Sequence, residues 1–399
     1  MPQPVELRVG LQTWAVTVPP EKTLALQRAE LPTAPAESPR DLVRGALEAP
    51  FGFEPLRRAL VPDDRVVIVF DPNLPHPAEL LAGVLDHLGT AGITPATVTV
   101  ITQPETRRDW IEALPPEFAA VTAQTHDPTD RAKLAYLGST QSERRIYLNR
   151  TLVESDFVIV LTGRRFDPVR FYAGAQVAIY PDLADEALRA ENAGPYTSAD
   201  PWPGREESIE VAWMLGMPFL VQAIEDEGDT VREVVAGLLG SEEEGRRRQD
   251  ARWKAKVPEK ATVVIATVSG AADRVTFADL ARAAACAARV VEEGGRIVLL
   301  SDAPPQLGAG AQMLRTLDGP RTPLRRLERE KPADWAACKQ WVFAARTASM
   351  FVASGYPDDV VEELFATPLH TPAELQRLMD SAGSVLIIPD AHKSKVTVE

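Results

Sequence analysis

The stretch DFVIVLTGRRFDPVRFYAGAQVAIYPD, residues 156–182, indicates the fold class of the chain. It opens with an apolar run, Phe157 to Leu161, that is rich in β-branched residues and bounded by polar turns. Such a run is typical of a strand buried on both faces. A polar loop containing glycine follows, and ligands of open α/β sheets usually bind beyond the carboxyl end of a buried strand. The loop is therefore either a binding loop or an ordinary surface connection.

A strand–helix–strand pattern precedes this stretch. Residues 65–70 predict a buried strand, 78–90 an amphipathic helix and 97–101 a second strand. A helix between two strands makes them parallel, with a right-handed crossover. The loop 71–77 after the first strand has no G-x-G-x-x-G sequence, so the fingerprint of dinucleotide-binding proteins is absent.

The same pattern recurs in the second half of the chain, with strand, helix and strand at 262–268, 277–292 and 296–301. This organisation predicts the α/β class, with two doubly wound, Rossmann-like domains and a cleft between them. The charged stretch 225–260 is expected to be a solvated helix face and to mark the domain boundary. We therefore place the first domain at residues 1–255 and the second at 256–399. The last strand or the tail could pack back on the first domain.

Composition narrows the class of protein. The 399 residues are 45% hydrophobic and 25% charged, which is typical of a globular enzyme, and the net charge is −14. An acidic chain has no electrostatic reason to bind nucleic acid or an anionic membrane. Two cysteines, Cys286 and Cys338, cannot supply a disulfide framework or a thiolate zinc site. No signal peptide or membrane-spanning run is recognisable, so we expect a cytoplasmic protein.

Four polar loops follow predicted buried strands and are the candidate binding loops, at 71–77, 103–109, 162–176 and 302–311. Several arginines in them suggest a small-molecule anion as the partner: Arg107, Arg108, Arg164, Arg165 and Arg170. The same arginines could instead be solvated or paired with the acidic surface. His126 and Asp127, adjacent in another loop, are candidates for an acid/base pair.

Several segments stand in one collinear order along most of the chain. They are ALEAPFGFEPLRRAL (46–60), DDRVVIVFDPNLPHP (63–77), ITQPETRRD (101–109), THD (125–127), LGST (137–140), LNRTLVESDFVIV (148–160), FYAGAQVAIYPDLA (171–184), GREESIEVAWMLG (204–216) and EEGGRIVLLSDAPPQLGAG (292–310). Their order resembles the lactate racemase (LarA-like) family. The family has a D-x-T-R-P-x-P loop after its first strand, then a G-T-H-R loop, an N-R-x-x-x-x-A-D pattern and a G-G-A-K segment.

The resemblance implies a chemistry as well as a fold. Family members so far understood use a nickel-pincer nucleotide, which is bound covalently to a lysine. They racemise or epimerise 2-hydroxy acids by removing and returning a hydride, with histidines as acid and base. The resemblance implies a substrate- or cofactor-binding role for the positions that correspond to family motifs. They are Asp71, Asn73, Leu74, Arg107, Gly174, Gln176, Asn192, Asp279 and Arg282.

Most of these positions depart from the family pattern. Asp71 is kept, but Asn73 and Leu74 replace the threonine and arginine of the first loop. Thr106 replaces the histidine of the second loop, beside a kept Arg107. Thr106 is a candidate for acid/base work only by its position in the family motif, because threonine has no useful pKa for a base. His126 and Asp127 are candidates because their side chains can exchange protons.

The cofactor positions depart too. Gln176 stands where the resemblance expects the lysine that carries the cofactor, and an amide cannot form that linkage. Asn192 lies near the expected metal-binding histidine. Asp279 and Arg282 fall where glutamine and lysine are expected. We therefore expect no metal site of the usual kind, and the cofactor stays unknown.

Two functions remain. The chain could be a divergent racemase- or epimerase-type isomerase that acts on a small 2-hydroxy acid or related anion without the covalent cofactor. Alternatively, it is a catalytically inactive paralogue that serves as a small-molecule-binding or assembly protein. The sequence leaves the substrate and the oligomeric state open.

Overall fold

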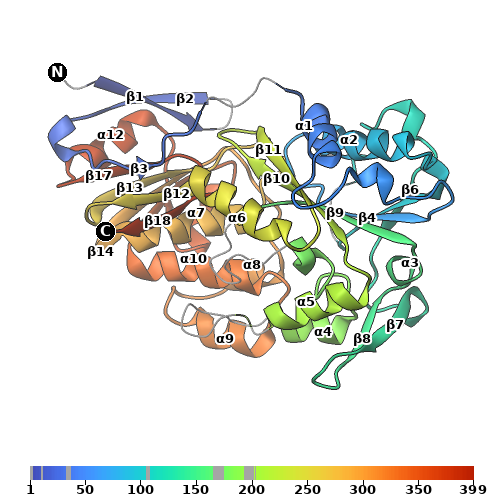
Figure 1. The fold of residues 1–399 in the computed structure, drawn as a ribbon. Helices are drawn as coiled ribbons and strands as arrows, with labels where there is room; N and C mark the ends of the chain where they lie inside the picture. Colours follow the sequence, from blue (N-terminus) through green and yellow to red (C-terminus); the bar gives the residue numbers. More distant parts are fainter. Residues whose placement is uncertain are drawn as a thin grey trace.

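The computed structural model describes residues 3–9, 12–32, 37–104, 108–164, 175–192, 202 and 204–399 (Figure 1). Thr106, Arg107 and Gly174, which the family resemblance singles out, lie outside these residues. Two large sheets dominate the described part, and the predicted α/β class with two doubly wound sheets is confirmed. No helix among the described residues is long and apolar enough to cross a membrane.

The first sheet has six strands in the order β11-β10-β9-β4-β5-β6. Their bounds are β4 (Val66–Phe70), β5 (Val98–Thr102), β6 (Thr122–Thr125), β9 (Phe157–Gly163), β10 (Phe219–Glu225) and β11 (Val231–Gly237). All neighbours are parallel except the β10–β11 pair. β9 lies between β4 and β10, so the stretch that begins at residue 156 does open with a buried central strand.

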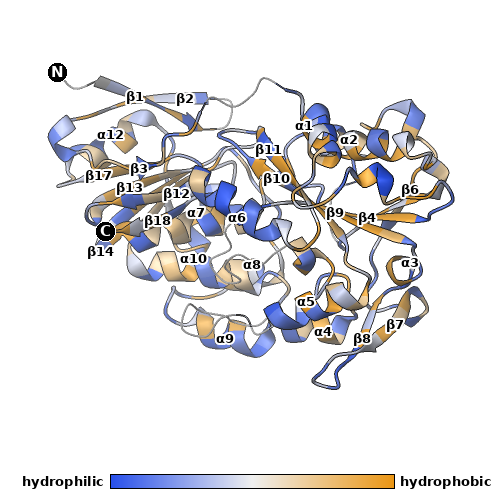
Figure 2. Ribbon diagram, in the orientation of Figure 1, coloured by the Kyte–Doolittle hydropathy of each residue, from blue (hydrophilic) through white to orange (hydrophobic). Residues whose placement is uncertain are grey.

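Helices and short elements cover both faces of this sheet. One face packs against α1 (Pro39–Glu48) and α2 (Pro77–Thr90). The other packs against the hairpin of β7 (Leu134–Ser139) and β8 (Arg145–Asn149), the short helix α3 (Arg150–Val153), the 3-10 turn η6 (Ala175–Ala178), α4 (Glu186–Asn192) and α5 (Gly204–Met214). Burial on both faces explains why the central strands are almost wholly apolar (Figure 2).

The second sheet has five strands, all parallel, in the order β16-β15-β14-β13-β17. They are β13 (Ala261–Thr267), β14 (Val291–Leu300), β15 (Ser349–Ala353), β16 (Ala366–Pro368) and β17 (Val385–Ile388). One face packs against α7 (Phe277–Val290) and α10 (Trp335–Thr347), and nearby lie the shorter α8 (Ala309–Leu314), α9 (Pro323–Glu330) and α11 (Asp358–Glu363).

The other face of the second sheet is covered by α12 (Pro372–Asp380) and by the N-terminal hairpin. The hairpin consists of β1 (Gln3–Val9) and β2 (Gln12–Val18), which pair antiparallel as the alternation in residues 5–18 predicts. Its apolar side chains join the core of the second sheet, so the start of the chain and its second half share a core. The boundary at residue 255 stays a prediction.

A small three-stranded sheet joins distant parts of the chain. Its order is β18 (Lys395–Val398), β12 (Lys254–Val257) and β3 (Gln27–Arg28), which come from the end, the middle and the start of the sequence. Before β12 lies α6 (Ser241–Trp253). The charged stretch 225–260 is thus only partly the solvated helix that the sequence predicts, because β11 precedes α6 and is a strand.

Candidate functional site

The carboxyl ends of three central strands meet at one edge of the first sheet. A Cβ atom placed on Gly163, at the end of β9, would lie 2.8 Å from Leu74 Cδ2 and 3.7 Å from Glu225 Oε1. Leu74 follows β4, and Glu225 ends β10. Leu74 is fully buried in the apolar core, so at this edge it supplies packing, while Glu225 supplies charge. A larger residue at position 163 would displace the Leu74 side chain.

A polar pocket lies between this edge and the corresponding edge of the second sheet. Its cavity volume is about 20 Å³, which is room for about one water molecule. The first sheet contributes residues after β4 and β10, and the second sheet contributes residues after β13 and β17 and the start of α7. The lining residues are Asn73, Pro75, Glu225, Gly228, Asp229, Ser269, Gly270, Arg274, Val275, Asp279, His392 and Lys393. Two of the binding residues singled out in the sequence, Asn73 and Asp279, therefore come together here.

Asp71 shapes the first loop of the pocket. Its Oδ1 accepts a hydrogen bond from the backbone N–H of Asn73 at 3.0 Å, and its own N–H donates to the carbonyl oxygen of Leu161 at 3.1 Å. The first contact closes an Asx turn, and the second ties the loop to β9. Asp71 therefore presents Asn73 to the pocket.

Asp279 begins α7 and closes a capping box. Its Oδ2 accepts hydrogen bonds from the N–H (2.9 Å) and the hydroxyl (2.6 Å) of Thr276, and its Oδ1 pairs with Arg282. A capping box satisfies N–H groups that would otherwise lack partners at the start of the helix. The structure thus joins Asp279 and Arg282 as an ion pair, in a helix cap that lines the pocket.

Ion pairs balance the charges around the pocket. Lys393 pairs with Glu225 at 3.3 Å, Arg274 pairs with Asp229, and Arg282 pairs with Asp279. Each cation therefore already faces a carboxylate of the protein. A ligand carboxylate entering the pocket would compete with these carboxylates for the same cations.

His126 and Asp127 lie apart from this pocket and have separate partners. His126 is 2% exposed, and its Nε2 lies 2.9 Å from the carbonyl oxygen of Ala184, while Nδ1 lies 3.4 Å from Asn149 Nδ2. This arrangement suits a neutral ring with the proton on Nε2, and burial lowers the pKa of His126. Hydrogen bonds from Thr129 and Lys133 lower the pKa of Asp127 to about 2.

Gln176 lies in the 3-10 turn η6 and is fully buried. Within the described part of the chain, neither its Oε1 nor its Nε2 has a hydrogen-bond partner. The backbone N–H groups of Ala175 and Gln176 donate to the carboxylate of Glu242, in the first turn of α6. Burial raises the pKa of Glu242. The turn around Gln176 is thus tied to α6 through its backbone, while its amide lies among buried groups.

Asn192 holds the end of α4. Its Nδ2 donates to the carbonyl oxygen of Leu188 at 2.9 Å, and its Oδ1 accepts from the indole N–H of Trp202 at 3.0 Å. Both polar atoms of the amide therefore serve packing of α4 and Trp202. This position does not offer the imidazole nitrogen that a nickel ion would use.

The residues present do not fit the covalently bound nickel-pincer nucleotide of the family. The side chain at the expected attachment position is the amide of Gln176, which has no nucleophilic amine. Among the residues that the structure describes, no group of three or more His, Cys, Asp or Glu side chains could hold a metal ion.

The glycine-rich loop before α8 holds a carboxylate of the chain itself. The backbone N–H groups of Gly310 and Ala311 donate to the Asp334 carboxylate at 2.7 and 2.9 Å. A Cβ atom on Gly308 or Gly310 would lie within 2.7 Å of that carboxylate. The loop 302–311, a candidate binding loop in the sequence, thus cradles Asp334.

Sequence reasoning missed most of the residues that line the pocket, above all Glu225, Ser269, Arg274, His392 and Lys393. Each lies just after a strand of one of the two sheets or at the last residue of one. The signal was therefore available in the rule that ligands bind at carboxyl ends of parallel strands. The loop after β10 falls in the charged stretch 225–260, which the sequence predicts to be a solvated helix face.

The protein is of the α/β class. It has two mainly parallel sheets, and the carboxyl ends of their strands meet at a polar pocket. Residues 9–192 match the model of the lactate racemase N-terminal domain. The resemblance inferred from the sequence is confirmed.

The fold of the whole chain is similar to two solved structures. The lactate racemase apoprotein from Thermoanaerobacterium thermosaccharolyticum superposes with a TM-score of 0.80 at 17% identity, over 99% of this chain and 100% of the other. A protein from Thermotoga maritima superposes with a TM-score of 0.67 at 14% identity, over 93% of this chain and 100% of the other. No curated protein sequence matches the chain.

Proposed function

We propose that the chain is a divergent isomerase of the racemase or epimerase type that acts on a small 2-hydroxy acid or a related anion. The polar pocket between the two sheets carries this proposal. It lies where α/β sheets bind ligands, and two cations, Arg274 and Lys393, stand in its wall. The match of residues 9–192 to the lactate racemase N-terminal domain supports the reaction class.

The proposed enzyme works without a covalently attached nickel-pincer nucleotide. The amide of Gln176 supports this part, because it cannot make the bond that a lysine would. The chain's own residues then have two tasks, which are to bind the carboxylate of the ligand and to orient it. Arg274 is the group best placed to bind, because its side chain is 16% exposed, whereas that of Lys393 is 3% exposed.

The charge of the chain supports the partner class. A net charge of −14 favours a small molecule over nucleic acid or an anionic membrane surface as the partner.

The experiment follows the optical purity of single enantiomers. Purified protein is incubated with D-lactate, L-lactate and each enantiomer of mandelate, and the products are separated by chiral chromatography. We expect one of these acids to lose optical purity, and Arg274→Ala to abolish the conversion. Glu227→Gln, an exposed neighbour on the same side, should leave it unchanged. Stable enantiomers under all conditions would remove the proposal.

The second candidate function is a catalytically inactive paralogue that binds a small molecule or serves assembly. The paired charges of the pocket favour it, because each cation already faces a protein carboxylate. Thermal unfolding with the same acids separates the two candidates, since a ligand that binds only the folded state raises Tm. Stabilisation without any change in optical purity would support the binding protein.

A further inference from the structure

The turn after the last strand of the second sheet reaches across to the first sheet. Lys393 lies in this turn, and its ammonium donates to the carbonyl oxygens of Asp226 (2.9 Å) and Gly228 (2.7 Å) and pairs with the Glu225 carboxylate at 3.3 Å. An ammonium has three N–H groups, so these three acceptors use all of them. Lys393 therefore holds the end of β10 and the loop that follows it.

Asp390 makes a second bridge from the same turn. One carboxylate oxygen accepts from the backbone N–H of Gly228 at 2.9 Å. The other accepts from the backbone N–H of Ser269 at 3.1 Å and from the Ser269 hydroxyl. Gly228 belongs to the loop after β10 in the first sheet, and Ser269 follows β13 in the second. One side chain thus joins loops of both sheets.

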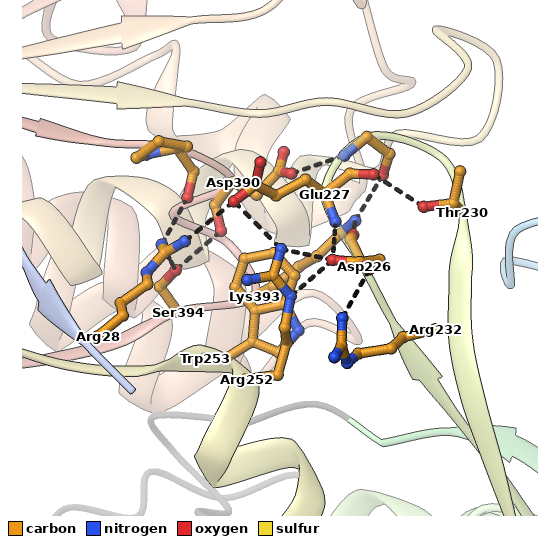
Figure 3. A network of polar contacts seen from close by, with 12 residues as sticks. Arg28, Asp226, Glu227, Thr230, Arg232, Arg252, Trp253, Asp390, Lys393 and Ser394 are labelled. Carbon is orange, nitrogen blue, oxygen red and sulfur yellow. Dashed lines mark hydrogen bonds and ion pairs between the residues drawn. The ribbon is translucent and has the colours of Figure 1, made fainter. Parts of the chain in front are cut away.

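The start of the chain and α6 complete this network (Figure 3). Arg28, in β3, donates to the carbonyl oxygen of Pro389 at 3.1 Å and to the Ser394 hydroxyl at 3.0 Å. The indole of Trp253 is 1% exposed and donates to the carbonyl oxygen of Glu225 at 2.9 Å. Lys393 Nζ lies 5.5 Å from the centre of the Trp253 ring. The ion pair of Lys393 therefore lies against an apolar wall that excludes water.

The same groups line the pocket. Glu225, Gly228, Ser269 and Lys393 all stand in its wall, so the contacts that join the sheets also fix its width. We propose that residues 389–394, which we call the clasp, hold the two facing edges together on one side of the pocket. Release of the clasp opens the pocket to a ligand. Separating the sheets would break the ion pair between the buried Lys393 and Glu225 charges, which is strongly unfavourable. The clasp therefore keeps the pocket closed when no ligand is bound.

The test measures amide hydrogen exchange in the full-length protein and the reactivity of His392, a pocket residue, with diethyl pyrocarbonate. Lys393→Met removes the central charge of the clasp. We expect exchange in residues 226–230 to rise at least about tenfold, because opening becomes easier. Carbethoxylation of His392 should become faster by a similar factor, while the strands of both sheets keep their protection.

Two further variants make the result decisive. Lys256→Met removes an exposed lysine of the neighbouring strand β12 and should change neither readout. Asp390→Asn keeps the ion pair of Lys393 but weakens the bridge to Gly228 and Ser269, and should also raise both rates. Loss of protection throughout both sheets in Lys393→Met would mean that this variant is globally destabilised. The proposal is then tested by the exchange and His392 reactivity of Asp390→Asn. Unchanged exchange in 226–230 and unchanged His392 reactivity in the folded variants would overturn the proposal.

Discussion

At the scale of single residues, Gln176 has the most unusual environment. It is fully buried, and within the described part of the chain its amide has no hydrogen-bond partner. A buried polar group that lacks partners costs about 1–3 kcal/mol of stability. Such a cost is tolerated where a polar group serves a ligand or an ordered water. The buried amide of Gln176 therefore lowers the stability of the chain.

This reasoning gives a stability prediction. Gln176→Met keeps the length of the side chain and removes its polar atoms, so the free energy of unfolding should stay the same or rise by about 1 kcal/mol. Urea denaturation measures the change. The matched control is Gln222→Met, because Gln222 is equally buried but donates to Ser241 through its Nε2, at 3.2 Å to both the carbonyl and the hydroxyl. The control should be destabilised, and equal losses in the two variants would contradict the argument.

His126 predicts how stability changes with pH. Burial lowers its pKa in the folded protein, so the unfolded chain, whose histidine has a pKa of about 6.5, takes up the proton first as pH falls. The neutral ring thus stabilises the fold above about pH 6.5, and this contribution is lost as pH falls from there toward the lowered pKa of the folded state.

The check is the free energy of unfolding at pH 7.5 and 5.5. His126→Gln, whose amide N–H can replace the ring N–H toward Ala184, should show a smaller loss between the two pH values than the unmodified protein. Burial also lowers the pKa of His87. Part of the stability loss at low pH should therefore remain in both the unmodified protein and the His126→Gln variant. His370→Gln at an exposed position controls for removing an imidazole. An identical slope in all three proteins would exclude His126 as the cause.

At the scale of elements, the capping box of α7 gives a stability prediction. Thr276 caps α7 through its side chain, with Asp279 returning the contact. Thr276→Ala should lower the free energy of unfolding by about 1 kcal/mol, because the cap N–H groups lose their acceptor. Thr322 precedes α9 but makes no cap hydrogen bond, so Thr322→Ala should cost only a few tenths. Equal losses of unfolding free energy in the two variants would contradict a stabilising role for the Thr276 cap hydrogen bond.

Elements with an unbroken apolar run could be predicted from the sequence, and amphipathic ones within charged stretches could not. β4, β9 and β13 are buried on both faces, so their sequences are mostly apolar. β11 is an edge strand that follows a charged turn. Its Arg232 and Glu233 interrupt the alternation of apolar and polar residues, so the sequence of 225–260 predicts a solvated helix instead. The strand forms because β10 offers it a partner, which local sequence does not reveal.

At the scale of the whole molecule, the site depends on segments that are far apart in the chain. Asn73 and Asp279 could be singled out from the sequence because they lie in family motifs, and the pocket brings them together. Lys393 and Glu225 are 168 positions apart, by subtraction of their numbers, and no local pattern links them. Their pairing arises only when two sheets meet edge to edge, so the clasp could not be read from the sequence.

The N-terminal hairpin gives the last prediction. Trp14 is 6% exposed and joins the core between the hairpin and the second sheet, with Val263 and Ile265 of β13. Trp14→Ala should lower the free energy of unfolding by about 3–5 kcal/mol, because a large buried side chain leaves a cavity. Hydrogen exchange should show the loss in β13 and β14 rather than in β4 and β9.

Trp213→Ala is the matched control, because Trp213 is 61% exposed on α5 and its removal should cost less than about 1 kcal/mol. The pair of variants tests whether the N-terminal hairpin stabilises the second sheet, although residues 19–260, which are 242 residues, separate Val18 from Ala261 in the chain. If Trp14→Ala loosens the first sheet instead, the hairpin does not act through the core that it shares with β13, and the second half of the chain folds without it.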